Sequence, residues 1–190
     1  AEKSAAIWFQ DWTGTGNDSR NSVINNGLIQ RTDGGNVIGT SGGNGIDFTN
    51  NGTVNGSLFF AKGDDNLTFM PGSNVTGNID GGGGKNKLNL DVGNDKVGGI
   101  LNGAIKNFTS LTKKGTGLWE ITGPMQGFDT VDVQQGTLGL SGNNDGFTGK
   151  ITVRKDASLS AKAESLPVNH PVNGNVGNID LTDGGTLIFE

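Results

Sequence analysis

The chain has 190 residues, of which 35 are glycine and none is cysteine, and its formal net charge at pH 7 is −5. This acidic balance argues against nucleic acid as a partner, because phosphate recognition needs a basic surface. The absence of cysteine excludes disulfides and is compatible with export through a bacterial periplasm. Hydrophobic residues make up 32 % of the chain. They stand at alternate positions in short runs, which is typical of half-buried strands.

The first segment of the chain is aromatic, since residues 7–12 read IWFQDW and hold two of the three tryptophans. We interpret residues 1–35 as an N-terminal cap or irregular first coils, because the end of a repeat structure must cover an open edge and an apolar bore. An aromatic platform for sugar rings is the alternative. Residues 36–190 are expected to form regular coils, and the whole chain is expected to be one segment of a longer protein.

A short phrase, apolar-x-Gly-x-apolar, recurs six times after this segment. Five complete copies span 54–58, 75–79, 101–105, 147–151 and 172–176, and an incomplete copy spans 125–127. Strand-like phrases at such a period indicate a repeat architecture, in which each unit buries its apolar side only by stacking on its neighbours. A second phrase at 63–69 recurs at 84–90, with 46–48 interpreted as an earlier copy and 138–140, 159–161 and 187–189 as later ones. A third strand is indicated at 131–133, 151–153 and 179–181.

Two or three short strands per repeat predict an all-β fold, a right-handed parallel β-helix (β-solenoid) of about eight coils, each of about 21 to 28 residues. Successive coils would lie about 4.8 Å apart, which gives a rod about 40 Å long. Val54, Val75 and Leu101 are then expected to stack in one inward column. The intervening threonine and asparagine side chains are expected to face water.

Residues 111–123, LTKKGTGLWEITG, resemble the autotransporter-associated β-strand repeat, in which L-x-K-x-G-x-G-x-L-x-L-x-G leads to Y-x-G-x-T-x-V-x-x-G-x-L. Residues 130–138 and 147–159 are similar to the second half, although Asp156 stands where the repeat carries a glycine. The resemblance implies the passenger region of a bacterial autotransporter, surface-displayed or secreted, whose parent protein carries an outer-membrane β-barrel. It implies an adhesin-like rod for cell adhesion or self-association, with a host surface protein, matrix, a glycan or another copy as partner.

Candidate catalytic residues are few. His170 is the only histidine, and a Ser-His-Asp triad would have to use it. Asp64, Asp65, Asp80 and Asp91 fall on consecutive predicted coils, and paired carboxylates are the machinery of glycosidases. A β-helical polysaccharide lyase or hydrolase is therefore the alternative function. We expect no enzyme and assign no catalytic residue, because these acids are typical of a solvated face.

Residues 62–67 and 81–84 are similar to the glycine- and aspartate-rich repeats of calcium-binding RTX β-rolls. Such rolls need an oxygen ligand at a fixed place in every repeat, whereas the second copy carries Lys85, Asn86 and Lys87 there. A lysine at that place repels a cation. We therefore predict polar turns between coils, with no metal and no cofactor, and keep a calcium-binding β-roll as a further alternative.

Overall fold

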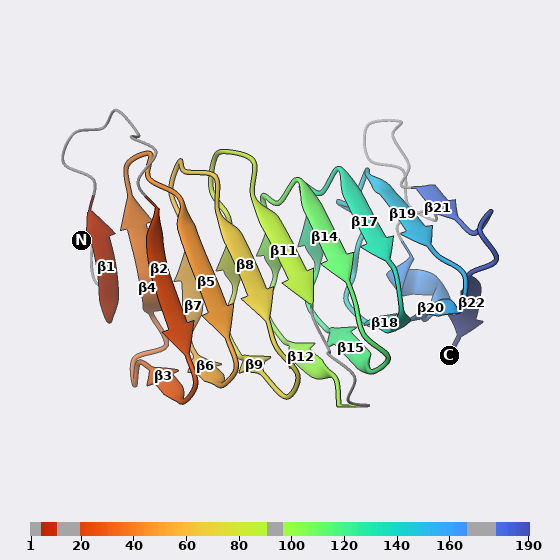
Figure 1. Ribbon diagram of the computed structural model, residues 1–190, viewed down its shortest axis with the longest axis horizontal. Helices are drawn as coiled ribbons and strands as arrows, with labels where there is room; N and C mark the ends of the chain where they lie inside the picture. Colours follow the sequence, from red (N-terminus) through yellow and green to blue (C-terminus); the bar gives the residue numbers. More distant parts are fainter. Residues whose placement is uncertain (1–4, 11–19, 91–96, 167–177) are drawn as a thin grey trace.

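The computed structural model describes residues 5–10, 20–90, 97–166 and 178–190, and its strands run side by side along one axis (Figure 1). Every strand pair is parallel, and the strands form three sheets. Sheet A contains β1 (Ile7–Gln10), β4 (Asn36–Ser41), β7 (Ser57–Phe59), β10 (Ile79–Asp80), β13 (Ile105–Lys106) and β16 (Met125–Gln126). Sheet B contains β2 (Asn21–Asn25), β5 (Ile46–Asn50), β8 (Asn66–Phe69), β11 (Lys87–Leu90), β14 (Ser110–Lys113), β17 (Thr130–Val133), β19 (Lys150–Val153) and β21 (Asn178–Asp180). Sheet C contains β3 (Leu28–Gln30), β6 (Thr53–Asn55), β9 (Asn74–Val75), β12 (Gly99–Leu101), β15 (Leu118–Ile121), β18 (Gly136–Leu140), β20 (Ala157–Ala161) and β22 (Thr186–Phe189).

From β1 to β18 the chain visits the three sheets in turn, so each of these turns of the helix adds one strand to every sheet. Within the described residues, six turns contribute a strand to all three sheets, and two later turns contribute strands to sheets B and C. A single 3₁₀ turn, Ala163–Ser165, is the helical element of the described chain. The predicted parallel β-helix is confirmed, and its complete three-stranded turns number about six. No helix in the described part of the chain has the length and hydrophobicity to span a membrane.

The interior is filled by columns of apolar side chains that cross the turns. Val54 pairs with Val75, and Val75 pairs with Leu101, so the predicted column is confirmed. All three side chains are fully buried. A second column in sheet B runs through Leu67, Leu88, Leu111, Val131, Ile151 and Ile179.

The glycine of the first phrase marks the corner between sheets C and A. A Cβ on Gly77 would lie 2.4 Å from the carbonyl carbon of Gly56, and one on Gly103 would lie 2.2 Å from the Gly77 oxygen. Side-chain-free residues are needed where backbones stack this closely. The same column continues through Gly123 and Gly142.

For two of the later copies of the first phrase, the prediction is wrong. Met125 pairs with Ile105, so the corner glycine of that turn is Gly123 and not Gly127. The copy at 147–151 lies at the corner between sheets A and B, because Ile151 pairs with Val131 in sheet B. The copy at 172–176 lies outside the described residues.

The second phrase also needs correction. Its copies at 63–69 and 84–90 stack as predicted, but Phe48, rather than Ile46, pairs with Leu67. The later copies at 138–140, 159–161 and 187–189 belong to sheet C. The predicted third strands at 131–133, 151–153 and 179–181 belong instead to sheet B, which is the sheet of the second phrase.

At the N-terminal end, β1, β2 and β3 pair in parallel with β4, β5 and β6. Ile7 and Phe9 pack against the core, while Trp8 pairs with Gly39. A Cβ on Gly39 would lie 2.5 Å from the Trp8 ring, so the indole covers this glycine. Asp11 and Trp12 lie outside the described residues, and the cap over residues 1–35 stays a prediction.

Candidate functional site

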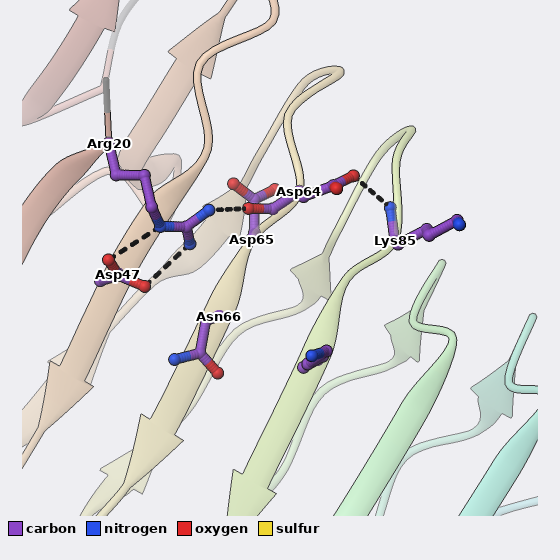
Figure 2. Close-up of a pocket in the computed structure, with 7 residues that line it drawn as sticks. Arg20, Asp47, Asp64, Asp65, Asn66 and Lys85 are labelled. Atoms are coloured by element: carbon purple, nitrogen blue, oxygen red, sulfur yellow. Dashed lines mark hydrogen bonds and ion pairs between the residues drawn. The ribbon is translucent and has the colours of Figure 1, made fainter. Parts of the chain in front are cut away.

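The corner between sheets A and B holds a hollow of about 410 Å³ near the N-terminal end of the rod (Figure 2). Four successive turns of the β-helix contribute to it, through the residue before β2, through β5, through β8 with the loop before it, and through β11 with the loop before it. Its lining carries both signs of charge and consists of Arg20, Asp47, Asp64, Asp65, Asn66, Lys85 and Lys87.

Arg20 joins three turns of the helix. Its Nε and Nη2 donate to the two carboxylate oxygens of Asp47 at 2.9 and 2.8 Å. Nη2 also donates to the Ile46 carbonyl at 3.0 Å, and Nη1 donates to the Asp64 carbonyl at 2.6 Å. The hydrogen bonds from the guanidinium hold the pKa of Asp47 below its usual range. The planar guanidinium of Arg20 matches the geometry of a carboxylate, and its hydrogen bonds hold the three turns in place at this corner.

Asp64 and Asp65 lie next to each other but point in different directions (Figure 2). Asp64 is exposed, and its Oδ1 accepts from the Lys85 backbone N–H at 2.7 Å. Asp65 is only 1 % exposed, and its Oδ1 accepts from the Ile46 N–H at 2.9 Å. Its Oδ2 is buried with no hydrogen-bond partner. Burial raises the pKa of Asp65 to about 7.

Asn86 follows Asp65 in the next turn, because Asn66 pairs with Lys87. Its Oδ1 accepts from the Asp65 N–H at 2.9 Å. Its Nδ2 donates to the carbonyls of Gly81, Gly83 and Asn107 at 2.7, 3.1 and 2.9 Å. The buried amide therefore ties its own loop to the next turn.

The four acids singled out in the sequence do not converge. Asp64 and Asp65 line the hollow, whereas Asp80 lies in sheet A, where its Oδ2 is 3.1 Å from the Lys106 Nζ. Asp91 and His170 fall outside the described residues. Arg20 and Asp47 complete the cluster and were not predicted from the sequence.

This arrangement limits the chemistry of the hollow. The Arg20 guanidinium is already bonded to the Asp47 carboxylate and to the Asp64 carbonyl, and the Asp65 carboxyl has almost no contact with solvent. No cluster of three or more histidine, cysteine, aspartate or glutamate side chains suited to a metal ion occurs among the described residues. The hollow is therefore a charged, hydrogen-bonded corner with one buried acid.

A second hollow, of about 470 Å³, lies at the other end of sheet B and is lined by Lys150 and residues 178–182. Lys150 Nζ lies 2.6 Å from Asp180 Oδ2, and this contact holds the pKa of Asp180 well below its usual range. The pair is on the surface, where such interactions stabilise weakly.

The outer face of sheet B, whose side chains contribute to both hollows, presents two columns of side chains. The strand register gives the first column as Ser22, Asp47, Asn66, Lys87, Ser110, Thr130, Lys150 and Asn178. It gives the second as Ile24, Thr49, Thr68, Asn89, Thr112, Asp132, Thr152 and Asp180. Except for Ile24 at the N-terminal end, every member is polar or charged.

The architecture places the chain in the class of parallel β-helices with a polar outer face. No family model matches the chain, and neither a curated protein nor a solved structure is significantly similar to it. Function must therefore be inferred from the surfaces and corners of the rod.

Proposed function

We propose that the chain is a segment of an autotransporter passenger that acts as an adhesin-like rod at the bacterial surface or after secretion. The observation that supports this proposal is the outer face of sheet B, where eight stacked strands carry two columns of polar side chains. The similarity of residues 111–123 to the autotransporter-associated repeat supports the same assignment. The rod mediates cell adhesion or self-association.

The physical basis of binding is repetition. Neighbouring strands lie about 4.8 Å apart, so an extended ligand or a second rod can contact several turns at once. Each hydroxyl or amide contributes little, but contacts that form together on one rigid face raise the overall affinity. Suitable partners are a host surface protein, matrix, a glycan or another copy of the rod.

Asp65 provides one observation in favour of the enzyme alternative. General acids of polysaccharide-degrading enzymes have raised pKa values, and burial raises the pKa of Asp65 to about 7. A catalytic acid must also reach its substrate. Asp65 is 1 % exposed, and its carboxyl accepts a hydrogen bond from the Ile46 N–H. We therefore rank catalysis below adhesion.

A turnover screen separates the two functions. The purified chain is incubated with polysaccharides and with ester and peptide substrates, beside Asp64→Asn, Asp65→Asn and His170→Ala. The proposal predicts no turnover by any of the four proteins. Turnover by the wild-type chain that disappears in one folded variant would overturn the proposal and establish an enzyme.

A further inference from the structure

The side chain of Asp65 occupies an inward position whose neighbours in the two adjoining turns are an apolar residue and an amide. In the strand register it lies between Ile46 in the preceding turn and Asn86 in the following one. Both of these neighbours are fully buried. A carboxylate in this place loses its hydration, and each buried oxygen then needs a donor within the protein.

Asn86 shows what this place in the corner requires. Its Oδ1 accepts a backbone N–H from the preceding turn, and its Nδ2 donates to three carbonyl oxygens. Asn144 behaves in the same way at another corner, where Oδ1 accepts from the Met125 N–H and Nδ2 donates to the Gly142 and Ser165 carbonyls. The corner therefore accepts a side chain with one acceptor and one donor.

Asp65 fulfils only the first half of this requirement when it is ionised. Its Oδ1 accepts from the Ile46 N–H, as the amide oxygen of Asn86 accepts from Asp65. No donor reaches its buried Oδ2, and a carboxylate has no proton of its own to donate from that oxygen. A protonated carboxyl has both an acceptor and a donor and so matches the asparagine pattern.

The charges around Asp65 do not compensate for its burial. Loss of hydration is the largest influence on its pKa, and the charge of Arg20 opposes it less strongly. The Arg20 guanidinium is already bonded to Asp47 and to the Asp64 carbonyl. The charged groups that line the same hollow are Arg20, Asp47, Asp64, Lys85 and Lys87.

We propose that Asp65 is a pH-sensitive switch: as a neutral acid it stabilises the corner between sheets A and B, and its ionisation destabilises that corner. The folded chain then binds one more proton than the unfolded chain between about pH 4 and pH 7, since the pKa of Asp65 is about 7 when folded and close to 4 when unfolded. The stability due to this group is fully present below about pH 4, falls across that window and is constant above it.

Two measurements test the proposal: the titration of the Asp65 carboxyl in the wild-type chain, and the pH dependence of stability in the wild type and in Asp65→Asn. The carboxyl carbon resonance of Asp65 is followed by NMR in the wild-type chain from pH 3 to pH 9. Urea unfolding of the wild type and of Asp65→Asn is then compared over the folded range. Asparagine mimics the neutral acid and reproduces the pattern of Asn86. Asp64→Asn, which changes the exposed neighbour on the same hollow, is the matched control.

We expect the resonance of Asp65 to titrate with a midpoint near 7. The unfolding constant of the wild type relative to Asp65→Asn should rise by up to about tenfold per pH unit between pH 4.5 and pH 6.5 and level off above pH 7.5. The corresponding ratio for Asp64→Asn should stay nearly constant. A midpoint near 4, or a ratio for Asp65→Asn that does not change with pH, would overturn the proposal. If Asp65→Asn fails to fold, the wild-type titration decides alone.

Discussion

The indole ring of Trp119 lies over the backbone of Gly99, its partner in the preceding turn of sheet C. The two residues are paired in register, and a Cβ on Gly99 would come within 2.4 Å of Cη2 of the ring. Trp119 is fully buried, and its ring centroid lies 6.4 Å from that of Phe69. The core accepts its largest side chain because the adjacent position in the column has none.

Substitution of Gly99 by alanine should therefore destabilise the rod. The added methyl group would overlap the Trp119 ring and approach the Ser73 carbonyl, whose oxygen would lie 2.8 Å away. Overpacking of this kind costs about 1–3 kcal/mol in the free energy of unfolding, measured by urea denaturation. The control is Gly27→Ala, because no atom lies within 4 Å of a Cβ placed there. Equal midpoints for the two variants would contradict this packing.

Lys113 is a buried cation that holds two turns together. Its Nζ donates to the carbonyls of Lys114, Gly115 and Gln135 at 2.9, 2.8 and 2.8 Å, and the side chain is fully buried. In Lys113→Met these carbonyls lose their charged donor, which should lower the free energy of unfolding by about 2–3 kcal/mol. Lys114→Met, at the exposed neighbour, should change it little. A stable Lys113→Met protein would show that the ammonium is dispensable.

Asp156 adopts a backbone conformation that favours glycine. Its φ is +63°, the same as that of Gly136 in the preceding turn, so the turn keeps the left-handed backbone that the glycine of the repeat would supply. Asp156→Gly should raise the free energy of unfolding by about 0.5–1 kcal/mol, because the left-handed region is unfavourable for a residue with a Cβ. Lys155→Gly should lower it, since glycine there only adds freedom to the unfolded chain. Thermal unfolding of both variants checks the opposite signs.

Folding should not require a metal ion. Arg20 already neutralises Asp47 in the hollow, and Lys85 and Lys87 on its lining repel cations. Thermal unfolding should therefore be nearly the same in EDTA and in millimolar Ca²⁺. A large increase of the midpoint with Ca²⁺, as expected when a ligand binds only the native state, would favour the calcium-binding alternative.

The fold could be predicted from the periodicity of the sequence, because every turn must place apolar side chains at the same positions to fill the core. The column of Val54, Val75 and Leu101 follows from a glycine held between two apolar residues, and the structure confirms it. The prediction for the fourth copy is wrong because two overlapping segments match the phrase. Residues 121–125 match the phrase at least as closely as residues 125–127 do, and their Gly123 is the residue that lies at the corner.

The site was predicted only in part. Alternation along the strands indicates the inward charged residues, since Asp65 has the same parity as Leu67, and Lys113 has the same parity as Leu111. Both charged side chains therefore had to point inward. Arg20 carried no such signal, because it meets Asp47 across 27 residues of chain and only through the stacking of turns.

Binding through the outer face of sheet B tests the central claim most directly. The wild-type chain is compared with the double variant Thr68→Arg/Thr112→Arg, at two outward positions of sheet B. The matched control is Thr137→Arg/Ser158→Arg, at outward positions of sheet C. The probes are a glycan array, immobilised collagen and a second copy of the chain.

The account predicts that the wild type and the sheet C variant bind at least one probe, with the same preference. The sheet B variant should remain folded and lose most of this binding, because two arginines interrupt one polar column. Absence of binding by the wild-type chain, or equal binding by the sheet B variant, would contradict the assignment of an adhesive rod.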